Sequence, residues 1–264
     1  MSQINQLNIS GITLTFLGED ISTVLLDRCF IPFTEKTESF ICIPVIISNI
    51  PINCTQGGYT HKFDTTKVIL SHDFSNAYIV GTMPMDRLLF SKCLSFLICI
   101  VLSAFQGIIL HASIVSYKNQ ALLFSGNSGQ GKSTQATLWS KFADAKILNH
   151  DKALIRYDNT WKSYGSPWSG ETHCYVNQSS PVKAIIFLEH GTRNELIPLD
   201  AKRALTMLFS QLRFFFDQID VLDMLTDTLG HLLRDIPIYL YRCLPDKSAV
   251  YYLESCLYLE GDRV

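Results

Sequence analysis

Short runs of hydrophobic residues dominate the first eighty positions, and this pattern is typical of β-strands. Breakers such as Gly57-Gly58 and Ser75-Asn76 interrupt the runs. The expected strands cover residues 12–17, 40–47, 68–70 and 77–80. The pattern therefore predicts a small β-rich N-terminal region over residues 1–84.

The next segment is almost uncharged, so it could be either a membrane span or a core helix. No formal charge occurs from Cys93 to Leu110, but Gln106-Gly107 interrupts the run and leaves Phe105 as the end of the apolar piece. A piece this short is more often a buried helix than a transmembrane span. We therefore expect a buried helix over residues 85–105 and no membrane span.

From Gly107 onward, strand-like and helix-like patterns are mixed, which indicates an α/β (α+β) fold class. Strands are expected at residues 108–110, 121–124, 146–149, 153–157, 161–164, 182–188 and 238–242, and helices at 133–142, 201–215, 218–234 and from Ser248. Residues 85–264 then form a second region. It contains the buried helix at 85–105, a nucleotide-binding core at 107–190 and a helical C-terminal part at 191–264.

A glycine-rich loop follows the strand at 121–124 and fits G-x-x-x-x-G-K-[ST] at every fixed position. Its glycines let the backbone wrap closely around a phosphate, and its N–H groups and the next helix favour an anion. In such a loop Lys132 reaches the β- and γ-phosphates of ATP and the Ser133 hydroxyl binds Mg²⁺. The expected nucleotide-binding residues are Gly126, Asn127, Ser128, Gly129, Gln130, Gly131, Lys132, Ser133 and Thr134.

Asp151 follows the expected strand at 146–149, so it should meet the loop at the same edge of the sheet. A carboxylate there can hold Mg²⁺ or accept the proton of an attacking hydroxyl. The alternative is a turn residue before a hairpin. The signatures of transporter ATPases, guanine-reading GTPases and protein kinases are missing from the sequence.

Three motifs together resemble the C-terminal domain of HPr kinase/phosphorylase and its small relatives, which include kinases that phosphorylate a serine of lasso-peptide precursors. The motifs are Leu110-His111-Ala112-Ser113, the loop at 126–134 and Asn149-His150-Asp151, and the resemblance covers about residues 107–190. It implies a phosphate-loop core like that of the phosphoenolpyruvate carboxykinases. It also implies Asp151, His150, Lys132 and His111 as catalytic residues, and Ser133 and Asp151 as Mg²⁺ ligands.

The chain departs from that family at three places. His150-Asp151 stands where HPr kinases have two adjacent acids, so the base is His150, Asp151 or both. Thr134 replaces a glutamate, and the glutamate-arginine-glycine stretch linked to phosphorolysis has no counterpart; Gly165-Ser166-Pro167-Trp168-Ser169-Gly170 stands in that region. We therefore expect neither phosphorylase activity nor HPr as the substrate. Trp168 is either a stacking face for a ligand or a packed tryptophan in a turn.

Other residues have two interpretations each. Arg203, Arg213, Arg234 and Arg242 are candidates for the cation that phosphoryl transfer often requires; three of them lie on expected helices, where an ordinary helix charge is the alternative. The leucines at 205, 208 and 212 recur at helical spacing and belong to the core or to a homo-oligomer interface.

Charge and composition exclude some partners. The balance of 22 basic and 24 acidic residues argues against a nucleic-acid binder. Eight cysteines without a Cys-x-x-Cys pair indicate reduced thiols, and the N-terminus lacks a secretory signal, so we expect a cytoplasmic protein. The predicted function is an ATP-dependent kinase acting on a hydroxyl of a peptide or protein, most simply a serine. The alternatives are a small-molecule kinase, a carboxykinase-like enzyme, or a nucleotide-binding regulatory or assembly ATPase without phosphotransfer.

Overall fold

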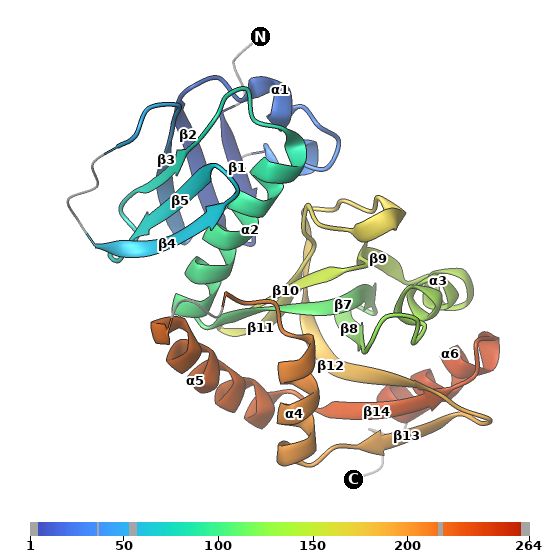
Figure 1. The fold of residues 1–264 in the computed structure, drawn as a ribbon. Coiled ribbons are helices and arrows are strands. Elements are labelled where there is room, and N and C mark those ends of the chain that lie inside the picture. Colours follow the sequence, from blue (N-terminus) through green and yellow to red (C-terminus); the bar gives the residue numbers. More distant parts are fainter. Residues whose placement is uncertain (1–4, 36, 53–56, 216–218, 260–264) are drawn as a thin grey trace. The chain divides into compact units, whose positions relative to one another are not determined.

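The chain folds as two compact units, each with its own mixed sheet, in the computed structural model (Figure 1). The structure describes residues 5–35, 37–52, 57–215 and 219–259. The first unit comprises residues 1–105 and 214–224, and the second comprises 106–213 and 225–264. This is an α+β protein, in agreement with the expected fold class. The unit boundary lies after residue 105, not after residue 84, because helix α2 (Arg87–Ala104) packs against two strands of the first sheet.

The first unit is built on a six-stranded sheet with the strand order β1-β2-β3-β6-β5-β4. Its strands are β1 (Gln6–Ile9), β2 (Ile12–Gly18), β3 (Ile41–Ser48), β4 (Gly58–Phe63), β5 (Thr66–Ser71) and β6 (Ala77–Val80). Two short helical segments, α1 (Ser22–Leu25) and η1 (Ile31–Phe33), connect β2 to β3. The four predicted strands are present. β1 and β4 were not predicted because β1 has only four residues and β4 carries polar side chains along most of its length.

Helix α2 provides much of the core of this unit. It packs on β4 and β5, and its Phe90 ring lies 5.4 Å from the ring of Phe16 and 5.5 Å from that of Phe30. The helix is long and apolar enough to cross a membrane, but 61% of that stretch is buried inside the protein. These contacts are those of a core helix, which is what the length of the apolar run predicts.

The second unit contains a sheet with the order β11-β10-β7-β8-β12-β14-β13, and β9 also pairs with β7. Its strands are β7 (Gly107–Tyr117), β8 (Gln120–Ser125), β9 (Lys146–Asn149), β10 (Lys152–Asp158), β11 (Thr160–Tyr164), β12 (Ser179–His190), β13 (Glu195–Pro198) and β14 (Ile238–Cys243). β12 runs parallel to β8 and β14, and the other pairings are antiparallel.

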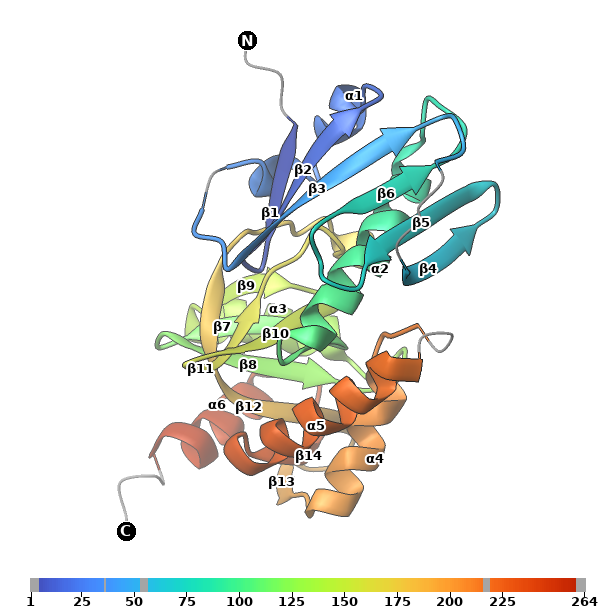
Figure 2. The ribbon, with the colours of Figure 1, turned by 90° about the vertical axis from the view of Figure 1, so that its left-hand side faces the viewer.

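Helices cover both faces of this second sheet. Figures 1 and 2 show α3 (Lys132–Ala143) and α6 (Lys247–Glu254) on one face, and α4 (Ala201–Gln211) with the second half of α5 (Ile219–Asp235) on the other. The chain after α6 continues as η3 (Ser255–Leu259), and a short turn of helix, η2 (Gly170–Thr172), lies between β11 and β12. α4 ends at Gln211, earlier than the expected residue 215.

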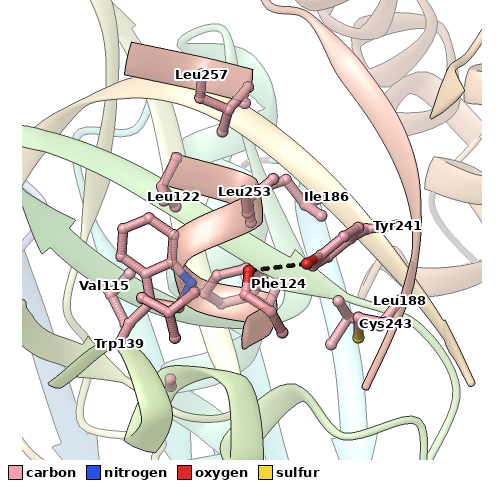
Figure 3. Close-up of a cluster of buried hydrophobic side chains, with 14 of the residues drawn as sticks. Val115, Leu122, Phe124, Trp139, Ile186, Leu188, Tyr241, Cys243, Leu253 and Leu257 are labelled. Atoms are coloured by element: carbon pink, nitrogen blue, oxygen red, sulfur yellow. Dashed lines mark hydrogen bonds between the residues drawn. The ribbon is translucent and has the colours of Figure 1, made fainter. Parts of the chain in front are cut away.

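The core under α3 and α6 fixes the helix that starts at Lys132. Trp139 and Phe124 are completely buried there, together with Leu253 of α6 (Figure 3). The Tyr241 hydroxyl donates a hydrogen bond to the backbone oxygen of Ala249 at 2.8 Å, which ties β14 to α6. Because α3 is anchored by buried side chains, its N-terminal end is held in place at the edge of the sheet.

The cysteines that the structure describes are all free thiols. Cys29, Cys93, Cys99 and Cys243 are buried, whereas Cys42 is exposed. Cys54 and the first four residues lie outside the described part of the chain.

Candidate functional site

The two predicted motifs lie at one edge of the second sheet, each at the end of a strand. β8 and β9 both pair antiparallel with β7, so they run in the same direction and end at the same edge. β8 leads into the glycine-rich loop (residues 126–131), and β9 leads into the turn that carries His150 and Asp151. Both segments line one pocket of about 540 Å³. Its lining residues are His111, Ser128, Gly129, Gly131, Lys132, Ser133, Thr134, His150, Asp151, Ser169, Gly170 and Thr172.

The glycine-rich loop has a backbone conformation that requires glycine. Gly129 and Gly131 have φ angles of +83° and +90°, and a Cβ atom added to either would meet nothing within 4 Å. A Cβ atom on Gly126, whose φ is +137°, would collide with the side chain of Gln130. The Gln130 Oε1 atom accepts a hydrogen bond from the backbone N–H of Asn127 at 2.7 Å. The loop is therefore braced at its start and open at Gly129 and Gly131, which fits the close approach of a phosphate.

Lys132 begins α3 and folds back over the loop. Its Nζ atom donates hydrogen bonds to the backbone oxygens of Gly126 at 2.8 Å and Asn127 at 3.0 Å. Burial lowers the pKa of Lys132, while the nearby Asp151 carboxylate opposes that shift. The ammonium group thus lies in a largely dehydrated position, where phosphate oxygens could replace its carbonyl partners.

Asn149 fixes the backbone of the turn after β9. This completely buried residue accepts hydrogen bonds at Oδ1 from the backbone N–H groups of Asp151, at 2.8 Å, and Lys152, at 2.9 Å. Its Nδ2 atom donates to the hydroxyl and backbone oxygens of Ser166 at 3.1 and 3.2 Å. Sequence reasoning did not assign a role to Asn149, although an asparagine before a turn is a known signal for this arrangement.

β7 holds the same turn from its other side. The Ser113 hydroxyl donates a hydrogen bond to the backbone oxygen of His150 at 3.0 Å. The backbone N–H of Ala112 donates a hydrogen bond to the backbone oxygen of Asp151, also at 3.0 Å. His111 lies within β7, because this strand continues to Tyr117 and does not end at residue 110 as expected. These contacts place His111 and Asp151 side by side.

The two histidines of the site are both shifted toward the neutral form. The Nε2 atom of His111 lies 3.4 Å from Oδ1 of Asp151. Burial is the main cause that lowers the pKa of His111, the Lys132 charge adds to it, and Asp151 opposes it. Burial also lowers the pKa of His150, whose buried Nδ1 atom has no hydrogen-bond partner among the described residues. Both imidazoles are therefore neutral at neutral pH.

The end of the segment from Gly165 to Gly170 forms part of the pocket lining beside Asp151. Ser169, Gly170 and Thr172 line the pocket, and a Cβ atom on Gly170 would lie 3.6 Å from the Cβ of Asp151. Trp168 is only 7% exposed, and the Nζ atom of Lys152 lies 5.1 Å from its ring centroid. Trp168 is thus the packed tryptophan of a turn and not a stacking face.

Of the four candidate arginines, Arg213 is the one whose charge reaches the site. The pKa of Lys132 and the pKa of His111 are lowered mainly by the burial of these two side chains, and the positive charge of Arg213 lowers both further. Arg242 instead pairs with Glu189 at 2.7 Å and with Glu195 at 3.4 Å. Arg203 lies on α4 and Arg234 in the last turn of α5.

Sequence reasoning missed Gln211, the last residue of α4. Its Nε2 atom donates a hydrogen bond at 2.9 Å to Oδ1 of Asn127 in the glycine-rich loop. Ala204, Leu208 and Gln211 are the buried residues of α4. A glutamine in an otherwise apolar helical row is a signal that could have identified it.

The pocket offers two ligands for Mg²⁺. In the described ranges no three His, Cys, Asp or Glu side chains gather into a metal site. Ser133, which carries a hydroxyl, and Asp151, which carries a carboxylate, both line the pocket. Mg²⁺ usually takes one or two such protein oxygens and completes its coordination with water and substrate phosphates. The two side chains therefore fit a cation that arrives with a nucleotide.

The fold and this site define an α+β protein with a glycine-rich strand–loop–helix turn facing a strand-end aspartate. The chain belongs to the family described as SynChlorMet cassette protein ScmC, whose model matches residues 82–244. Its structure is similar to that of the Hpr(Ser) kinase/phosphatase from Coxiella burnetii, with 12% identity and a TM-score of 0.36, over 58% of this chain and 98% of that one. No curated protein matches the sequence.

Proposed function

We propose that this protein binds Mg·ATP on the glycine-rich loop and transfers the γ-phosphoryl group to a hydroxyl of a peptide or protein. One observation carries the proposal: Lys132, Ser133 and Asp151 line a single pocket although they come from two different strand ends. The resemblance of the sequence motifs to the HPr kinase group supports the reaction type and the choice of a serine-like acceptor.

Lys132 and the start of α3 provide the positive charge in this proposal. The Lys132 ammonium exchanges its hydrogen bonds to the backbone oxygens of Gly126 and Asn127 for hydrogen bonds to phosphate oxygens. The N–H groups around Gly129 and Gly131 would bind the same phosphates. Arg213 adds a second cation near Lys132. When bound, Mg²⁺ neutralises charge between the phosphates, and Ser133 and Asp151 hold it.

Asp151 is the principal base of the proposed reaction. Its position is fixed by Asn149 and by Ala112, and a carboxylate can both hold the metal and orient the acceptor hydroxyl. His150 assists as a secondary base, because its imidazole is neutral and the residue lines the pocket. His111 contacts the Asp151 carboxylate and orients it. Catalysis then consists mainly of positioning and charge neutralisation.

A nucleotide-binding protein without phosphotransfer is the second candidate. The observation that favours it is His150, which stands in place of the first acid of the HPr kinases and whose burial weakens it as a base. The two candidates bind the nucleotide in the same way and differ only in the fate of the γ-phosphate.

Label transfer separates the two. The family description names a cassette protein, so the other products of that cassette are the acceptors to try first. Each is incubated with ATP labelled at the γ-phosphate, Mg²⁺ and either the wild type or the Lys132→Ala variant. The kinase proposal expects label on a hydroxyl residue of one product with the wild type only. Binding of Mg·ATP without transfer to any product would favour the second candidate.

A further inference from the structure

Gln211 is a buried polar residue at the end of an amphipathic helix. It is only 7% exposed and shares the buried side of α4 with Ala204 and Leu208. Burying a primary amide is unfavourable unless its N–H and C=O groups find partners. The partners of Gln211 therefore indicate why a polar side chain occupies this position.

The Gln211 amide contacts the candidate site through its Nε2 atom. The Nε2 atom donates to Oδ1 of Asn127 at 2.9 Å and to the Ser210 hydroxyl at 3.2 Å. The Gln211 side chain is also a minor cause that raises the pKa of His111 against the larger lowering effect of burial. Gln211 is thus bonded to the glycine-rich loop and lies near the histidine beside Asp151.

The backbone after Gln211 is attached to β7, next to His111. The N–H group of Arg213 donates to the backbone oxygen of Ile109 at 2.9 Å, and Leu212 forms an isolated β-bridge with Leu110. Gln211 is therefore held against the strand that carries His111. Its hydrogen bond to Asn127 then links this fixed strand to the loop.

We propose that Gln211 is a positioning residue that couples occupation of the glycine-rich loop to the placement of His111 beside Asp151. The backbone oxygen of Asn127 is one of the two acceptors that Lys132 must leave to reach a phosphate. The side chain of the same residue holds Gln211, so a change in the loop is transmitted to His111. This inference rests on the proposed function, because it requires Mg·ATP to bind at the loop.

Three variants test the coupling. Gln211→Met keeps the size and helix preference of the side chain but removes its hydrogen bond to Asn127. Asn127→Ala removes the same link from the loop side, at an exposed position where a failure to fold is not expected. Ser210→Ala is the matched control, since it removes the other acceptor of Gln211 and leaves the Asn127 link intact.

For each variant we would measure the Kd of Mg·ATP by calorimetry, kcat and KM for ATP hydrolysis with water as acceptor, and deuterium exchange with and without Mg·ATP. Gln211→Met and Asn127→Ala should lower kcat about 10- to 100-fold, the scale of a small misplacement of a catalytic group, and change Kd and KM less than about threefold. In the wild type and Ser210→Ala, Mg·ATP should slow exchange in peptides covering residues 109–113 and 126–135. In the two coupling variants only residues 126–135 should respond.

The outcomes separate the failure of this inference from that of the proposed function. If the wild type binds Mg·ATP and both coupling variants still protect residues 109–113 with an unchanged kcat, the role of Gln211 is refuted. The same holds if kcat and affinity fall together with the melting temperature, because Gln211 would then be only a structural residue. If the wild type does not bind Mg·ATP, the proposed function fails as well.

Discussion

The Nε2 atom of His111, on β7, lies 3.4 Å from Oδ1 of Asp151, in the turn after β9, although the two residues are forty positions apart. The pairing exists because the backbone N–H of Ala112 donates to the backbone oxygen of Asp151, which aligns β7 with the turn after β9. A neutral imidazole beside a carboxylate can orient it without neutralising its charge. This relationship leads to the first prediction.

Activity should persist to lower pH than an ordinary histidine would allow. The pKa of His111 and of His150 is lowered, chiefly by burial, so each stays neutral until the pH falls below its usual value of about 6.5. We expect kcat for ATP hydrolysis to be constant from pH 8 to about 6.5 and to fall only below that value. A pH–rate profile of the wild type measures this, and an acid limb centred at or above pH 6.5 would contradict it.

Asp151 should matter more than His150. Asp151→Asn removes the charge that holds Mg²⁺ and accepts a proton, so kcat should fall by about 10³-fold or more, on the scale of losing a principal electrostatic contact. His150→Ala should leave measurable activity, because general-base assistance is worth about 10²–10⁴-fold. Initial rates for both variants at pH 7.5 decide the order. A dead His150→Ala beside an active Asp151→Asn would reverse the two roles.

Asn149 should be required for both stability and activity. Asn149→Ala leaves the backbone N–H groups of Asp151 and Lys152 without their acceptor. Each buried group that loses its partner lowers the free energy of unfolding by about 1–3 kcal/mol. Asn149→Asp keeps the acceptor oxygen but replaces the donor to Ser166 by a buried carboxylate, so it too should be destabilised. Urea unfolding and ATP turnover should place both variants below the wild type. Equal stability of Asn149→Ala and the wild type would refute the role of this turn.

The protein should remain in solution without detergent despite the apolar helix α2. Most of that helix is buried inside the protein, so it does not need a bilayer to cover its side chains. Ultracentrifugation of a cell lysate measures this directly. Recovery only in the membrane pellet, with extraction only by detergent, would show that α2 spans a membrane.

The parts of the site that could be predicted are those encoded by contiguous residues. The loop motif at 126–133 specifies its own conformation through its glycines, and Asp151 follows a recognisable strand. The two segments lie at the same edge of the sheet because β8 and β9 run in the same direction. The alternation of strands and helices in the sequence suggests this common direction. The hydrophobic pattern also located α2, α3 and most strands, because burial on one face gives a strong periodic signal.

The parts that could not be predicted depend on contacts between distant residues. Gln211 lies 84 positions from Asn127, and nothing in the local sequence specifies that they pair. Trp168 is buried in the structure and contacts Ser166 and Lys152, whereas the composition of its segment alone fitted an exposed stacking face equally well. β13 was missed because it is only four residues long and pairs with β14 across a longer separation in the sequence. Such contacts require the three-dimensional structure.

Binding of Mg·ATP to the wild type and to Lys132→Ala, measured by calorimetry, tests the central claim most directly. Lys132 is buried in the loop and donates only to backbone oxygens there, so its replacement by alanine should leave the circular dichroism spectrum unchanged. The account predicts that the wild type binds Mg·ATP and that the variant loses nearly all of this affinity, because the lysine provides the charge that meets the phosphates. Binding of equal strength to both proteins, or none to the folded wild type, would contradict it.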